Sequence, residues 1–131
     1  MNAVFTYGSL MFTDVWSRVV RGEYLQACAI LPGYRLRAIR EETFPAIIKT
    51  GNNDQVSGIL YLDIDNSDLA RLDEFEGDYY RRETVSVISA GKTIRAETFS
   101  LRAEFIHLLD ERGWDAAEFE RRDLKNFIAN L

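Results

Sequence analysis

Cysteine and histidine are scarce in this sequence. It has one cysteine, Cys28, and one histidine, His107. A single cysteine excludes an internal disulfide, and these two residues together cannot supply the four nitrogen and sulfur ligands of a structural zinc site. We therefore expect a reducing compartment and no bound metal. Cys28 lies in an apolar segment, which predicts a buried and inert thiol, and His107 lies in a polar segment, which predicts an exposed and non-catalytic side chain.

Basic residues are outnumbered, and long apolar runs are missing. The chain has 21 acidic and 16 basic residues and a net charge of -5. This balance argues against a nucleic acid or an anionic membrane as the partner. No apolar run approaches the roughly 20 residues that span a bilayer, and the N-terminus lacks the basic and apolar regions of a signal peptide. We expect a soluble, cytoplasmic protein.

The remaining composition is that of a globular protein. With 47% hydrophobic and 28% charged residues, the chain can bury a core and still present a solvated surface. Its 131 residues fall within the roughly 100–200 of one domain. We therefore expect residues 1–131 to form a single domain.

Strands are predicted over most of the chain before residue 101. Residues 3–7 are apolar and end at a glycine, which predicts a buried strand followed by a turn and a short helix capped by Thr13 or Asp14. Turn residues then separate three pairs of β-prone segments. These pairs are 24–31 with 34–39, 44–50 with 55–64 as a hairpin, and 84–89 with 93–101.

Two longer helices are predicted. In residues 66–76, Asn66 or Ser67 can cap the start, and Gly77 can end this helix in the left-handed conformation. Residues 115–131 repeat apolar side chains at helical spacing, and Asp115 with Glu118 fits a capping box at their start. The sequence therefore predicts one continuous closing helix.

The first candidate for chemistry is Tyr7-Gly8-Ser9-Leu10, where a buried strand gives way to a helix. A glycine at such a point lets a ligand approach backbone N–H groups that have no strand partner, so the segment can bind an anion or an oxyanion. The alternative is a plain turn in which Ser9 helps to cap the helix.

The second candidate is Glu76. Leu69, Leu72 and Glu76 are spaced i, i+3 and i+7, so the carboxylate belongs to the apolar stripe of its helix and should point inward. Glu74 and Asp68 lie off this stripe and should be solvated. Burial disfavours a charged carboxylate, so the pKa of Glu76 should rise from about 4.3 toward neutrality, where it can exchange protons.

Other interpretations of this acid stay open from the sequence. Glu76 can instead be an ion-pair partner of Arg81 or Arg82, or an exposed residue in a fraying last turn. Asp73 shares part of the same stripe and is the other acid that can face a pocket.

Together the two motifs resemble a known superfamily. The strand ending in Tyr-Gly-Ser-Leu, the later Leu-Asp-Glu-Phe-Glu-Gly and the following Tyr80-x-Arg82-x-x-Val85 resemble the γ-glutamylcyclotransferase-like superfamily, in its avirulence-induced-gene-like and γ-glutamylamine cyclotransferase branch. Phe44-Pro45-Ala46, Val56-x-Gly58-x-Leu60-Tyr61 and the aromatic C-terminal segment add to the likeness, which spans nearly the whole chain.

The resemblance implies an α+β fold, a small mixed β-barrel with flanking helices. It also implies a pocket in which Tyr7, Gly8, Ser9 and Leu10 hold a γ-glutamyl group, Glu76 is the acid/base, and Tyr80, next to Tyr79, lines the site. Leu10 stands where the longer glutathione-degrading members carry asparagine, which argues against glutathione as the substrate.

The implied reaction suits these residues. A γ-glutamyl amide carries its own nucleophile, the α-amine, so one carboxyl of intermediate pKa can take a proton and return it to the leaving amine without a cofactor. The products are 5-oxoproline and a free amine or amino acid. Two alternatives remain: a non-catalytic module that binds an amino-acid-like small molecule, and an acyltransferase that acts on another amine.

Overall fold

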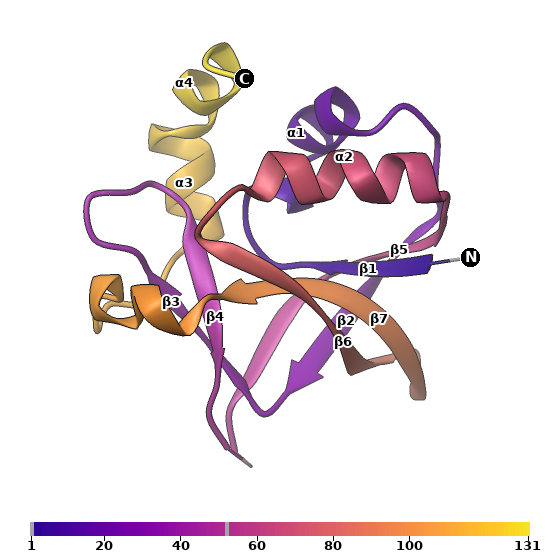
Figure 1. Ribbon diagram of the computed structural model, residues 1–131, viewed down its shortest axis with the longest axis horizontal. Helices are drawn as coiled ribbons and strands as arrows, with labels where there is room; N and C mark the ends of the chain where they lie inside the picture. Colours follow the sequence, from indigo (N-terminus) through magenta and orange to yellow (C-terminus); the bar gives the residue numbers. More distant parts are fainter. Residues whose placement is uncertain (1, 52) are drawn as a thin grey trace.

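Five strands close into a barrel in the computed structural model, which describes residues 2–51 and 53–131. β1 runs antiparallel to β5 and parallel to β7, so the barrel is mixed (Figure 1). With helices around it, this is the α+β barrel that the resemblance implied. In order around the barrel the strands are β1 (Asn2–Thr6), β5 (Gln55–Ile64), β2 (Gln26–Pro32), β6 (Tyr80–Ser89) and β7 (Lys92–Leu101).

A separate two-stranded sheet lies beside the barrel and corrects one prediction. β3 (Tyr34–Ala38) pairs with β4 (Pro45–Lys49) in antiparallel register. The predicted hairpin of 44–50 with 55–64 is therefore wrong, because β5 pairs with β1 and β2 instead. Closing the barrel uses both edges of β5, and local turn residues do not decide that choice. Asn52, within the predicted turn, lies outside the described residues.

The hairpin of β6 and β7 is confirmed. The two strands are paired without interruption from Tyr80 opposite Leu101 to Ser89 opposite Lys92. Ala90 and Gly91 form the turn, and both have positive φ, 51° and 76°. Two successive residues with positive φ fit the right-handed twist of the strands that they connect.

Two helices lie side by side over the barrel: α1 (Thr13–Val19) and α2 (Asn66–Glu76) (Figure 1). The bounds of α2 match the prediction, but its cap is Asp65 and not Asn66 or Ser67 as predicted. The Asp65 side chain accepts a hydrogen bond from the N–H of Asp68 at 2.7 Å. Gly77 ends α2 with positive φ of 72°, but its ψ of -156° is extended, so the cap is not the left-handed one predicted. Thr13 begins α1 and Phe12 precedes it without a side-chain cap, so the predicted cap by Thr13 or Asp14 is wrong.

The predicted closing helix is broken into α3 (Ala116–Arg122) and α4 (Leu124–Ala129). Asp115 caps α3 as predicted, whereas Glu118 pairs with Arg122 at 3.1 Å in place of completing a capping box. The break falls at Asp123. In one straight helix Phe119 and Phe127 would be about 12 Å apart along the axis, but their ring centroids lie 5.6 Å apart. The break therefore lets two aromatic side chains pack on each other.

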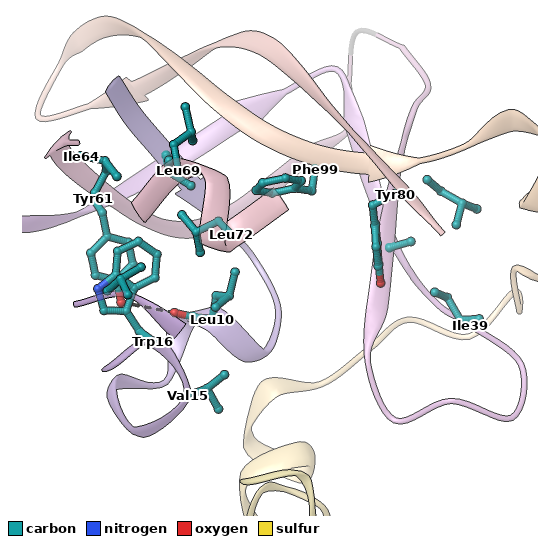
Figure 2. Close-up of a cluster of buried hydrophobic side chains, with 14 of the residues drawn as sticks. Leu10, Val15, Trp16, Ile39, Tyr61, Ile64, Leu69, Leu72, Tyr80 and Phe99 are labelled. Carbon is teal, nitrogen blue, oxygen red and sulfur yellow. Dashed lines mark hydrogen bonds between the residues drawn. The ribbon is translucent and has the colours of Figure 1, made fainter. Parts of the chain in front are cut away.

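The core has two parts, one inside the barrel and one between the barrel and the helices. Neighbouring residues of β1 serve both, since Phe5 faces the barrel interior and Val4 faces the helices. In the second part Trp16 stacks on Tyr61 with ring centroids 3.6 Å apart (Figure 2). The Tyr61 hydroxyl donates to the carbonyl of Leu10 at 3.3 Å (Figure 2). This core therefore holds the segment after β1 against the barrel.

Asp68 corrects a further prediction, because it is only 1% exposed and not solvated. It accepts hydrogen bonds from the N–H groups of Arg21 and Gly22, the Tyr24 hydroxyl and the Arg71 guanidinium. Burial alone acts to raise its pKa, but these hydrogen bonds together hold the pKa well below its usual value. Asp68 therefore ties α2 to the chain that follows α1.

Gly58 is required where the end of β1 lies against β5. A Cβ atom on this residue would lie 2.1 Å from the carbonyl oxygen of Thr6 and 2.8 Å from the ring of Phe5. Only glycine allows the end of β1 to approach so closely.

Cys28 corrects another prediction. A buried thiol was expected, but Cys28 is exposed on β2.

Candidate active site

The segment from Tyr7 to Leu10, here named the β1 loop, leaves the barrel directly after β1 and enters the 3₁₀ helix η1 (Ser9–Met11). Its residues are buried, and the Tyr7 hydroxyl donates to the carbonyl of Phe99 at 2.5 Å. The N–H groups of Met11 and Phe12 bond back to Gly8 and Ser9. The N–H groups of Ser9 and Leu10, at the start of the turn, have no partner within it.

Gly8 allows a close approach between two segments of the chain. A Cβ atom at this position would lie 3.0 and 3.1 Å from two ring carbons of Pro45. The glycine therefore lets the β1 loop lie directly against the segment that begins β4.

A cavity of about 120 Å³ lies between the β1 loop, the end of α2 and the start of β4. All six residues predicted for the site line it: the four of the β1 loop, Glu76 and Tyr80. The rest of the lining is mostly aromatic and apolar: Phe5, Thr6, Phe44, Pro45, Phe75, Phe99 and Phe127. The cavity therefore combines one carboxyl group with largely apolar walls.

Glu76 is the last residue of α2, and its carboxyl group opens onto this cavity. Burial raises its pKa from 4.5 to about 8. Among the described residues, every fully buried side-chain oxygen has a hydrogen-bond partner. The Glu76 carboxyl takes part in none of these hydrogen bonds, so its oxygens are not fully buried and reach the cavity space. The inward orientation predicted from the helical spacing is thus found.

The alternatives for this acid do not match the geometry. Arg81 pairs with Glu83 at 3.1 Å, and Arg82 pairs with Asp73 at 3.3 Å and with Glu97 at 3.8 Å. Neither arginine holds Glu76. The Asp73 side chain is 42% exposed and does not line the cavity, so the prediction that it can face a pocket is wrong. Glu74 is exposed, as expected.

Two tyrosines flank the carboxyl group. The Tyr80 hydroxyl donates to the carbonyl of Pro45 at 2.6 Å, and Figure 2 shows its ring against β4. Burial, with the charge of Glu76 as a smaller cause, raises the pKa of Tyr80 well above its usual value. Burial likewise raises the pKa of Tyr7, with Tyr80 and Glu76 as smaller causes. Both hydroxyls therefore stay protonated donors. Tyr79 does not line the cavity and packs on Phe105.

The aromatic wall of the cavity was not predicted from the sequence. Phe44, Phe75 and Phe127 come from three distant segments, and Phe75 and Phe127 contact each other edge to face with centroids 6.4 Å apart. Helical spacing marked Phe127 only as an apolar position. Its place in the wall depends on the break at Asp123, which no local pattern showed.

Two features are absent from residues 2–51 and 53–131. In that part of the chain no three His, Cys, Asp or Glu side chains are grouped so that they could hold a metal ion. None of its helices is long and apolar enough to cross a membrane. His107 is exposed on η2 (Ala103–Leu108), as predicted.

Similar folds are known from solved structures. A solution structure from Arabidopsis thaliana superposes with a TM-score of 0.73 over 98% of this chain and 87% of that one, at 24% identity. A structure described as a gamma-glutamyl cyclotransferase has a TM-score of 0.68 over 77% of this chain and 66% of that one, at 22% identity. At these identities the likeness establishes the barrel fold.

The likeness in sequence to known proteins identifies the family as well as the fold. AIG2-like protein D of Arabidopsis thaliana is 36% identical over 102 residues, which are 76% of this chain and 66% of that protein. AIG2-like protein B is 27% identical over 98% of this chain and 74% of that protein. The matches thus span about two thirds to three quarters of the length of these relatives. The family model for gamma-glutamyl cyclotransferase, AIG2-like, matches residues 4–118, and the chain belongs to this family.

Proposed function

We propose that this chain is a γ-glutamylcyclotransferase that converts a γ-glutamyl amine or a γ-glutamyl amino acid to 5-oxoproline and releases the free amine. The observation that carries the proposal is the Glu76 carboxyl group, which opens onto a small cavity opposite the β1 loop with a pKa of about 8. Membership of the family supports the reaction class.

The size of the cavity suits the acyl half of such a substrate. One water-sized sphere needs about 10–15 Å³. If each non-hydrogen atom takes one such sphere, the cavity of 120 Å³ holds about eight to twelve non-hydrogen atoms. A γ-glutamyl group has roughly nine non-hydrogen atoms, which fits this range. The amine half must then extend out of the cavity.

The β1 loop can bind the negative groups of the substrate. The N–H groups of Ser9 and Leu10 start a 3₁₀ turn and can donate to an α-carboxylate or to the oxyanion that forms at the γ-carbonyl. The mostly apolar walls exclude water, which strengthens such hydrogen bonds.

Glu76 transfers the protons in this proposal. Its ionised carboxylate takes one proton from the α-ammonium, and the freed amine attacks the γ-carbonyl carbon to form the ring C–N bond. The bond to the leaving nitrogen then breaks, while two protons pass one at a time through Glu76 from the attacking to the leaving nitrogen. The reaction needs no oxidant and no second substrate.

The raised pKa suits this role. An α-amino group has a pKa of about 8, and each unit of mismatch between donor and acceptor is worth about 1.4 kcal/mol. An ordinary glutamate would be mismatched by about 3.5 units, or about 5 kcal/mol, whereas a carboxyl with a pKa of about 8 is nearly matched.

Release of 5-oxoproline tests the proposal. The purified chain is incubated with a panel of γ-glutamyl amines and amino acids, and 5-oxoproline is measured by chromatography. Glu76→Gln keeps the size and polarity of the side chain but cannot accept the proton, so turnover should fall by about 10²–10⁴-fold. Glu74→Gln, on the exposed side of α2, is the matched control and should have the wild-type rate.

Three outcomes would contradict the proposal. A Glu76→Gln protein with the wild-type rate would remove Glu76 from the reaction. Binding of a γ-glutamyl compound without any 5-oxoproline would indicate a binding module. Formation of a new γ-glutamyl amide with an added amine, in place of 5-oxoproline, would indicate an acyltransferase.

A further inference from the structure

A second cavity, more open to solvent and lined mostly by exposed residues, adjoins the first. It has a volume of about 400 Å³ and is lined by Thr43, Asp123, Asn126, Phe127, Asn130 and Leu131. Phe127 lines both cavities, and Thr43 directly precedes Phe44, which lines the first. The two cavities therefore meet where the segment before β4 lies next to helix α4.

The fixed positions of these two segments define the second cavity. The Trp114 indole N–H donates to the carbonyl of Thr43 at 2.8 Å, which ties the segment before β4 to the chain before α3. On the other side, Phe127 packs on Phe119, which is buried. The shared wall is thus anchored in the core.

The two cavities differ in chemistry. The first has apolar walls and one carboxyl group of raised pKa, whereas four of the six residues that line the second have polar side chains. Asp123 is the one charged side chain among the residues that line it, and two asparagines add amide groups. The Asn130 amide donates to the carbonyl of Asn126 at 2.8 Å, so part of this surface is already ordered.

We propose that the second cavity receives the amine half of the substrate and that Asp123 selects γ-glutamyl amines whose far end carries a positive charge. The proposal rests on the function proposed above, because the acyl half fills the first cavity and the amine half must leave it. Phe127 is the wall along which the amine would pass. A carboxylate near the far end attracts an ammonium group and repels a carboxylate.

Three substrates of matched length test this selectivity. They are the γ-glutamyl derivatives of 1,4-diaminobutane, n-pentylamine and 4-aminobutanoate, whose far ends are positive, neutral and negative. Initial rates of 5-oxoproline release give kcat/KM for each. We expect the diamine derivative to exceed the pentylamine derivative by about three- to ten-fold, as for a partly exposed ion pair, and the aminobutanoate derivative to be the poorest.

Substitution of Asp123 assigns the preference to this residue. In Asp123→Asn the ratio of kcat/KM between the diamine and pentylamine derivatives should fall close to one. Glu120→Gln removes an equal charge from an exposed position on α3 that lines neither cavity, and it should keep the wild-type ratio. Because the readout is a ratio within one protein, a loss of folded protein does not change it.

Each outcome decides the proposal. A ratio near one in the wild type, or the wild-type ratio in Asp123→Asn, would overturn the assignment of the amine subsite and leave the cyclotransferase function standing. Failure of the wild type to release 5-oxoproline from all three compounds and from the wider γ-glutamyl panel would overturn the proposed function, and with it the subsite.

Discussion

Replacing Glu76 by glutamine should stabilise the protein, and by an amount that depends on pH. The pKa of this carboxyl is 4.5 without burial and about 8 in the fold. Below about pH 4.5 both states are protonated and burial carries no penalty. Between pH 4.5 and 8 the unfolded chain ionises while the folded protein stays protonated, so the free energy of unfolding falls as pH rises. Above about pH 8 both states are ionised and the penalty is constant.

The magnitude follows from the size of the pKa shift. At about 1.4 kcal/mol per unit, a shift of about 3.5 units has an upper limit of about 5 kcal/mol. Between pH 5 and pH 8 we expect the advantage of Glu76→Gln over the wild type to grow by about 3 kcal/mol. The glutamine fills the same space and opens onto the same cavity, so packing should not change.

Urea unfolding of both proteins at pH 5 and pH 8 measures this effect. A change of about 3 kcal/mol moves the midpoint by roughly 1–3 M urea. Glu74→Gln should leave the free energy of unfolding within about 0.5 kcal/mol of the wild type at both pH values, since its side chain is exposed. If Glu76→Gln were less stable than the wild type at pH 8, the carboxylate would be stabilised by a partner and our account of its desolvation would be refuted.

Three further substitutions test the site and the fold. Gly8→Val should raise KM for a γ-glutamyl substrate at least tenfold, because the valine side chain would lie against Pro45 in the cavity wall. Circular dichroism should show that the protein stays folded. An unchanged KM would exclude the β1 loop from binding. Gly58→Ala should lower the free energy of unfolding by about 3 kcal/mol or more, because its Cβ would overlap the carbonyl of Thr6, and a wild-type melting temperature would contradict this close approach. Asp68→Asn should lower the free energy of unfolding by about 3 kcal/mol at pH 7. Because the pKa of Asp68 is depressed in the fold, this loss should shrink as the pH falls from about 4 to 2, and an undiminished loss at pH 2 would show that the charge is not responsible.

The sequence predicted the bounds of α2 and the orientation of Glu76 well because their signals are local. Polar capping residues, leucines three residues apart and a glycine at the end determine the bounds of α2 without help from distant segments. The same spacing places Glu76 on the buried side. The inward orientation of this acid therefore needed no knowledge of the barrel.

Features that depend on distant contacts were missed. Helical spacing alone predicts that Asp68 is exposed. In the structure the chain after α1 covers it, and the N–H groups of Arg21 and Gly22 donate to its carboxylate. The partner of β4 was mistaken because β5 is occupied on both edges by barrel strands. In both cases the local sequence is compatible with either outcome, and tertiary contacts decide.

The break at Asp123 lies just beyond the part of the chain that matches the family model. The β1 loop, the end of α2 and Tyr80 all lie within residues 4–118, the part that matches the family model, whereas α4 and Phe127 lie after it. Proton transfer and amine recognition would thus depend on different stretches of the chain. A chimera that exchanges residues 123–131 for another C-terminal segment, but keeps the phenylalanine at position 127 that also lines the catalytic cavity, could therefore change which amine is released while leaving the cyclisation step intact.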